Sequence, residues 1–237
     1  LRLVGSEMCI RDRYPVHGTM GVFTVPDQTT QNGKVGYGHI WTGHHKRNSE
    51  RISEIADFSL LYSQLLLLYY RFTGEKETVD RYYGIADGIL KHFSQYARED
   101  GLLEQVADKW NLVDWPENLR DGYDFPLTRP VVALGCHNVI NALYIGAMET
   151  QNTLAEICGR EMPYQTKEIK KAYRNAFYRE KTGLLADSET SSHAALHSNV
   201  YAMYFHLLPE ADEEKILTFM KPVSYTHLRA HETELHL

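Results

Sequence analysis

Helical segments of two kinds alternate along the chain, and this alternation most restricts its fold. One kind is apolar on almost every side, whereas the other is apolar on one face and charged on the opposite face. The predicted helices, beginning with the apolar kind and alternating, span residues 57–72, 78–97, 137–159, 164–178, 192–207 and 210–220. A helix that is apolar all round must be enclosed, while an amphipathic helix lies at the surface. The pattern therefore predicts three pairs, each of an inner and an outer helix.

A weak internal repeat supports this pairing. The second predicted helix runs into residues 98–103 and the fourth into residues 179–185, and both segments end in glycine followed by two leucines. The same short turn thus follows both outer helices before a longer connection leads back to an inner helix. We interpret these units as α-hairpins arranged in a ring with parallel inner helices, an all-α fold of the (α/α)6 barrel type, with roughly half of the ring present. Residues 21–25 and 34–41 are predicted as short strands.

Both ends of the chain look foreign to the remainder. Residues 4–13 and 222–231 can be encoded by DNA strings that are reverse complements of each other, and the string resembles a transposase adapter used to prepare sequencing libraries. We therefore expect residues 1–13 and 222–237 to be non-native ends derived from an adapter. Residues 14–221 are then expected to be an internal fragment of a longer gene, and they form one partial domain.

Composition argues against several classes of protein. The net charge of −6 gives no footprint for nucleic acid or for an anionic membrane surface, and no apolar run is long enough to cross a bilayer. Outside the two ends, Cys136 and Cys158 remain, and they lack the CxxC spacing of a zinc site. We expect no metal, no cofactor, and neither nucleic acid nor a membrane as a partner. The compartment stays open between the bacterial cytoplasm and the periplasm or exterior.

The stretch of residues 110–130 has the composition of a sugar pocket. It holds two of the three tryptophans, and its prolines and Gly122 exclude a long helix. Acidic and aromatic side chains lie together in it, namely Asp114, Trp115, Glu117, Asp121, Tyr123, Asp124 and Phe125. A tryptophan can cover the apolar face of a sugar while carboxylates bind its hydroxyls. A surface loop with its aromatic side chains packed onto the domain remains an alternative.

If the inner helices are parallel, their N-terminal ends lie on one face of the ring, where helix N–H groups are free to bind oxygen-rich ligands. For Asp57 and Ser191 at these ends, a helix cap is the simpler interpretation. His137 and His193 are either hydrogen-bonded buried histidines or ligands of a substrate. Our candidates for substrate binding are Asp57, Asp114, Trp115, Glu117, His137 and His193. The sequence assigns no catalytic residue.

Four segments resemble a known family. They read IADFSLLYSQLLLLYYRFTGEKETVDRY, WNLVDWPENLRDGYDF, HNVINALYIGAMETQNTLAEICG and SSHAALHSNVYAMYFHLLPE, and they cover most of residues 55–210. In this order they resemble the catalytic domain of bacterial α-L-rhamnosidases, the six-hairpin glycosidases of glycoside hydrolase family 78. The resemblance implies an (α/α)6 barrel that acts on rhamnosides, releases terminal α-L-rhamnose with inversion, and places Asp114 and Trp115 beside the sugar.

The chain departs from the family's pattern in two ways. The family's general acid, a Glu in a CPxRxE-like motif, and its general base, a Glu further along, have no counterpart here. Since an inverting glycosidase needs both carboxylates, the resemblance implies that they lie outside this fragment, which alone is inactive. In addition, the family's Trp-Gly-Asp context is absent at Asp57, which follows Ile55 and Ala56.

Three other functions remain open. One is a sugar epimerase or isomerase of the same fold, which would use His137, His193 and His197 as acid and base. Another is a non-catalytic carbohydrate-binding protein. A helical-repeat scaffold is the third, but a scaffold has no need to concentrate tryptophan and aspartate in one stretch.

Overall fold

The computed structural model describes residues 55–106, 111–114, 117–127 and 135–220, together with the backbone of residues 24–26 and 35–37. Its helices are α2 (Ala56–Leu60), α3 (Tyr62–Thr73), α4 (Lys76–Phe93), α5 (Asn138–Cys158), α6 (Lys167–Phe177) and α7 (Leu196–Tyr204), and residues 210–220 are also helical. Two 3-10 turns, η4 (Ser94–Tyr96) and η5 (Glu117–Leu119), complete the helical elements that it describes. The fold is therefore all-α, as the sequence predicts, and the predicted foreign ends lie outside the described residues.

The first predicted helix is divided in two, which the sequence pattern did not indicate. At Leu61, between α2 and α3, ψ is −6°, far from the helical value. Two residues earlier, the Ser59 hydroxyl donates a hydrogen bond to the carbonyl of Ile55 over 3.0 Å. A serine bonded back onto the preceding turn often bends a helix, but the helical bond from the Leu61 N–H to the carbonyl of Asp57 is kept over 3.0 Å. At the other end, Gly74 adopts a φ of 70° and stops α3.

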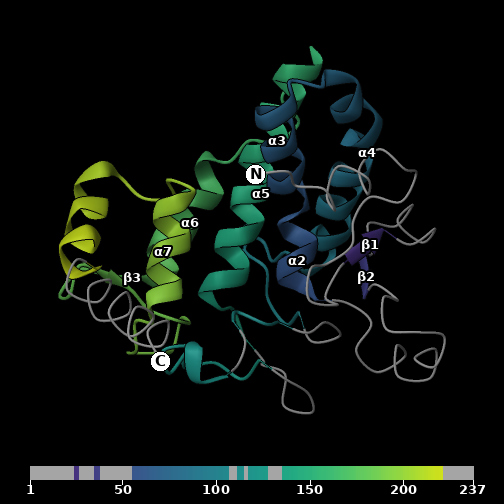
Figure 1. The fold of residues 1–237 in the computed structure, drawn as a ribbon. Coiled ribbons are helices and arrows are strands. Elements are labelled where there is room, and N and C mark those ends of the chain that lie inside the picture. Colours follow the sequence, from purple (N-terminus) through teal and green to yellow (C-terminus); the bar gives the residue numbers. More distant parts are fainter. Residues whose placement is uncertain are drawn as a thin grey trace, which may run out of the picture.

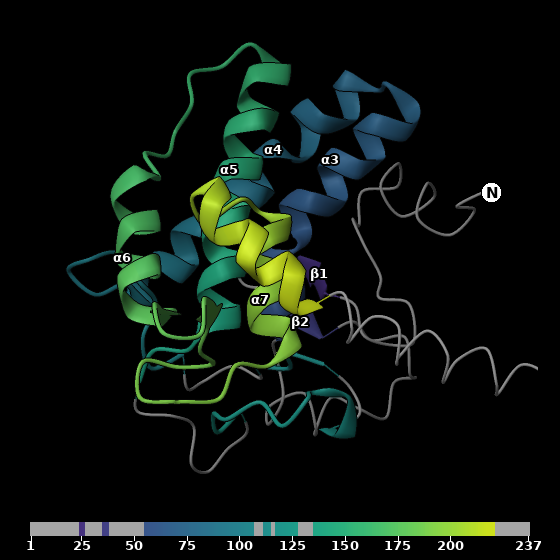
Figure 2. The ribbon, with the colours of Figure 1, turned by 90° about the vertical axis from the view of Figure 1, so that its left-hand side faces the viewer.

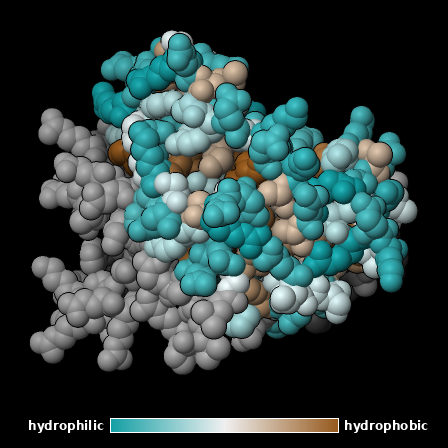
Figure 3. Space-filling view, turned by 180° about the vertical axis from the view of Figure 1, so that it is seen from behind, coloured by the Kyte–Doolittle hydropathy of each residue, from teal (hydrophilic) through white to brown (hydrophobic). Residues whose placement is uncertain are grey.

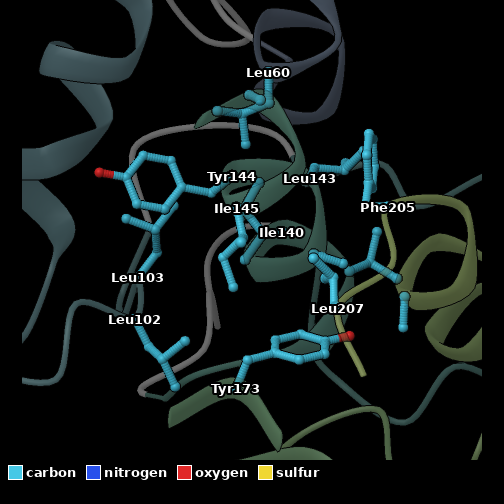
Figure 4. Packing of buried hydrophobic residues seen from close by; sticks show 14 of the residues in the cluster. Leu60, Leu102, Leu103, Ile140, Leu143, Tyr144, Ile145, Tyr173, Phe205 and Leu207 are labelled. Carbon is cyan, nitrogen blue, oxygen red and sulfur yellow. The ribbon is translucent and has the colours of Figure 1, made fainter. Parts of the chain in front are cut away.

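Helix α5 is the centre of the molecule, and α3, α4, α6 and α7 pack around it (Figures 1 and 2). Of its 21 residues, 15 are buried, so it is enclosed on nearly all sides. Leu60 of α2, Tyr173 of α6 and Phe205 after α7 converge on its apolar side chains (Figure 4). Phe205 lies against Gly146, where an added Cβ would be 2.4 Å from its ring, so only glycine fits this close approach.

The predicted outer helices are buried on one face only. In α6 the buried residues Ile169, Tyr173 and Phe177 recur every four positions, and the remaining positions are partly or fully exposed. In α4 the buried side chains lie on one face and the charged Lys76, Glu77 and Arg81 on the other. From behind, the described surface is largely hydrophilic, with hydrophobic areas confined to a few places (Figure 3). The contrast between inner and outer helices is confirmed for α5 against α4 and α6, whereas α7, predicted as an inner helix, has only three of its nine residues buried.

The internal repeat forms the same structure twice. After α4, Ala97 pairs with Leu103 in an isolated antiparallel bridge, and after α6, β3 (Tyr178–Arg179) pairs antiparallel with β4 (Leu184–Leu185). Each turn contains a glycine at positive φ, Gly101 at 87° and Gly183 at 70°, a conformation that side chains disfavour. The two predicted strands near the N-terminus correspond to β1 (Thr24–Pro26) and β2 (Val35–Tyr37), which pair antiparallel.

Candidate functional site

The N-terminal ends of α2, α5 and α7 lie at one end of the helical array, where residues 111–114 and 117–127 cross them (Figure 1). Hydrogen bonds join this stretch to all three helices. Asp57 of α2 bonds to Leu112, His137 at the start of α5 bonds to Asn111, and Asp121 accepts a bond from the backbone N–H of Leu196 in α7. The predicted gathering of polar residues on one face is therefore present.

Asp57 is buried, with 6% of its surface exposed. Its carboxylate accepts hydrogen bonds from the backbone N–H groups of Leu112, over 2.7 Å, and Val113, over 3.0 Å. Burial raises the pKa of Asp57, while these two bonds and the nearby Arg120 guanidinium act in the opposite direction. The helix-cap interpretation of Asp57 was wrong, because the N-cap of α2 is Ile55 and the Asp57 carboxylate holds a segment far away in the sequence.

His137 is enclosed, and both of its ring nitrogens have partners. Nε2 lies 3.1 Å from Oδ1 of Asn111, and Nδ1 lies 3.0 Å from the Tyr123 hydroxyl. The ring stacks on Phe125 with centroids 4.5 Å apart. Burial lowers the pKa of His137 to about 3, so the imidazole is neutral at physiological pH. Since Oδ1 of Asn111 can only accept, we assign the proton to Nε2.

The carboxylate of Asp187 is the most completely bonded acidic group of the site, and its residue is fully buried. One oxygen accepts from the backbone N–H of Ala195 and the Ser198 hydroxyl, each over 2.7 Å. The other accepts from the backbone N–H of Asp124 over 2.9 Å and lies 2.6 Å from Nδ1 of His193. Asp187 thereby joins α7 to the crossing stretch. The sequence analysis missed it, although it lies just beyond the leucine pair of the second repeat.

His193 is the exposed partner of this buried carboxylate, with 43% of its side chain exposed. Its Nε2 faces Gly122, where an added Cβ would be 3.5 Å away. Ser191 donates a hydrogen bond to Oδ2 of Asp124 over 2.7 Å and accepts one from the His193 backbone N–H. Ser191 is therefore not a helix cap, contrary to the simpler interpretation, since Ala195 is the N-cap of α7.

The carboxylate of Asp114 pairs with His197 of α7. Its Oδ2 lies 2.9 Å from Nε2 of His197, and 40% of its side chain is exposed against 16% for the histidine. Tyr201 lies one turn further along α7. Burial raises the pKa of Tyr201 to about 12, and the charges of Asp57 and Asp114 act in the same direction, so its hydroxyl stays protonated. Carboxylate, imidazole and phenol side chains therefore lie near one another.

Two predicted site residues lie wholly or partly outside the described part of the chain. Trp115 lies outside the described residues, and for Glu117 only the backbone position in η5 is described. Within the described part of the chain, no group of three His, Cys, Asp or Glu side chains is arranged to hold a metal ion. Nor does any described helix have the length and apolar character needed to cross a membrane.

The chemistry of the site suits hydroxyl groups better than proton exchange at His137. A neutral imidazole that is buried and partnered at both nitrogens is a poor acid or base. The epimerase alternative is thus left with His193 and His197. The exposed carboxylate of Asp114 and the exposed ring of His193 are hydrogen-bonding groups that a polyhydroxyl ligand can reach.

Comparison with known proteins identifies related folds. A family model described as the bacterial alpha-L-rhamnosidase 6 hairpin glycosidase domain matches residues 41–228. A GH78 family rhamnosidase of Bacillus sp. GL1 superposes with a TM-score of 0.55 at 16% identity over 70% of this chain. A rhamnosidase from Klebsiella oxytoca, solved with rhamnose bound, gives the same TM-score at 12% identity over 71% of this chain. No curated protein matches the sequence significantly.

The chain spans only part of these related structures. It covers 17% of the Bacillus chain and 31% of the Klebsiella chain. At such low identity the superpositions establish a shared helical fold, and the family match rests on the sequence itself.

Proposed function

Because the chain belongs to the bacterial α-L-rhamnosidase six-hairpin glycosidase family, we propose that it supplies sugar-binding residues to a glycoside hydrolase that releases terminal α-L-rhamnose. In this proposal the substrate is a rhamnoside, and the bond is cleaved by an inverting acid/base mechanism. The general acid and general base lie outside residues 14–221, which form part of the catalytic domain of a longer protein. The protein needs neither a metal nor a cofactor for this chemistry.

The exposed carboxylate of Asp114 is the observation that carries the proposal. Its backbone is fixed, since the carbonyl of Asp114 accepts a bond from the Arg120 guanidinium over 3.0 Å. Its side chain remains 40% exposed beside His197. A fixed carboxylate that is 40% exposed can accept hydrogen bonds from sugar hydroxyls, and the adjacent Trp115 offers the apolar ring that covers a sugar face.

The proposed roles differ among the candidate residues. Asp114, Trp115 and His193 contact the sugar directly, and Glu117 contributes a further carboxylate on the same stretch. Asp57 and His137 lie behind them, since their polar atoms are already bonded to the protein. In an inverting enzyme one carboxylic acid protonates the leaving oxygen while a second carboxylate activates water on the opposite face of the sugar. The residues of this chain bind and orient the sugar between those two groups.

The test uses this chain and the complete product of its gene, obtained by sequencing on both sides of residues 14–221. Both proteins are incubated with an aryl α-L-rhamnoside, and the anomer released is followed by NMR. We expect the complete protein to release β-L-rhamnose first and this chain to release none. Hydrolysis by this chain alone would show that the acid and base lie within it. A complete protein that is folded but inactive on every rhamnoside would overturn the proposal.

A further inference from the structure

The backbone just before Asp114 is strained. Val113 adopts a φ of 59°, which is a genuine outlier for a β-branched residue. The N–H of Asp114 donates to the carbonyl of Leu112 over 2.7 Å, so Val113 is the centre of a γ-turn. The form of this turn with positive φ is rare and strained. Left to itself, the segment would relax to a conformation with negative φ, and the Asp114 side chain would then point elsewhere.

Asp57 holds this turn through two hydrogen bonds. Its two carboxylate oxygens each accept one of two consecutive N–H groups, from Leu112 and Val113. A single carboxylate thus fixes both peptide units that lead into the turn. The residue is 6% exposed, and the cost of burying its charge, which raises its pKa, is only partly offset by these backbone bonds and by the nearby Arg120 guanidinium.

We propose that Asp57 is the positioning residue of the site: its buried carboxylate clamps the strained γ-turn at Val113 and thereby aims the Asp114 carboxylate at His197 and at the substrate. The role in sugar binding rests on the proposed function, whereas the clamp itself does not. Strain that is held by a long-range bond next to an exposed functional group is typical of pre-organised sites.

The test combines the removal of the clamp with the removal of the strain. In Asp57→Asn the amide can accept only one of the two N–H groups and presents its own N–H₂ to the other. In Val113→Gly the turn takes positive φ without a Cβ penalty. The readout is the imidazole ¹H–¹⁵N signal of His197, whose Nε2 proton is bonded to Asp114, together with amide exchange at Val113. Ser59→Ala removes another buried hydrogen bond of α2 and serves as the control.

We expect Asp57→Asn to abolish the bonded His197 signal and to raise exchange at Val113 by at least about tenfold. Asp57→Asn/Val113→Gly should recover the signal, and Ser59→Ala should keep it. If Asp57→Asn does not fold, a double variant that folds and shows the bonded His197 signal counts as the same rescue. A single variant that keeps the signal, or a double variant that does not recover it, overturns the clamp.

The sugar readout separates the two ideas. L-rhamnose affinity should fall by about tenfold or more in Asp57→Asn and return in the double variant. An affinity that falls and does not return while the His197 signal does would mean that Asp57 contacts the sugar itself, against the inference. If the wild-type chain and the complete protein bind no rhamnose, the proposed function fails, and the His197 signals still decide the clamp.

Discussion

His137 should make the stability of the fold fall steeply as the pH is lowered from neutral. Burial lowers the pKa of this imidazole from 6.5 to about 3. In mild acid the His137 imidazole of the unfolded chain therefore binds a proton, whereas the same imidazole in the native protein stays neutral. The contribution is fully present above the unfolded pKa and is lost as the pH falls toward the folded pKa. At about 1.4 kcal/mol per pH unit, the change from pH 6.5 to pH 4 costs about 3 kcal/mol.

Denaturant unfolding between pH 7 and pH 4 measures this effect. We compare the wild-type chain with His137→Gln, in which an uncharged amide replaces the imidazole. The variant starts less stable because the stack on Phe125 is lost, but its stability should fall less with pH, by about one proton's slope. The control is Gly146→Ala, which destabilises the core without changing a titratable group, and it should retain the wild-type slope. Parallel pH profiles for the wild type and His137→Gln would refute the reasoning.

Three further predictions concern the core and the site. Gly146→Ala should destabilise the fold by about 1–3 kcal/mol, because its Cβ would lie 2.4 Å from the ring of Phe205. Gly84→Ala, in α4 with nothing within 4 Å of its Cβ, should stabilise the fold by about 0.5–1 kcal/mol. Thermal melts compare the two variants, and a change of stability in the same direction for both would contradict the packing described at Gly146. Asp187→Ala should cost at least about 3 kcal/mol in denaturant unfolding, because its four donors lose their acceptor, and a loss below about 1 kcal/mol would contradict that network.

The helices were predictable because each carries its own periodic pattern. The all-round apolar character of α5 and the single buried face of α6 can be read from spacing alone. The break at Leu61 could not be predicted in this way, because it is a change of one backbone angle within an uninterrupted apolar pattern. The repeated turns could be predicted because both end in glycine followed by two leucines. Each of these glycines has a positive φ.

The site was predicted as a location but not as a network. Placing the starts of the inner helices on one face was enough to bring Asp57, Asp114, His137 and His193 together. The roles were not predictable, because the bonds of Asp57 reach 55 and 56 residues along the chain. Asp187 was missed for the same reason: its partners come from residues on both sides of it, and only the fold brings them to one carboxylate.

Titration of this chain with L-rhamnose, followed by ¹⁵N NMR, tests the central claim most directly. The claim is that the polar end of the inner helices binds the sugar. We predict that saturating L-rhamnose shifts the signals of Asp114, His193 and His197, while those of α4, such as Gly84, stay in place. A folded chain whose signals do not move with L-rhamnose, or move only away from this end of the helices, would contradict it.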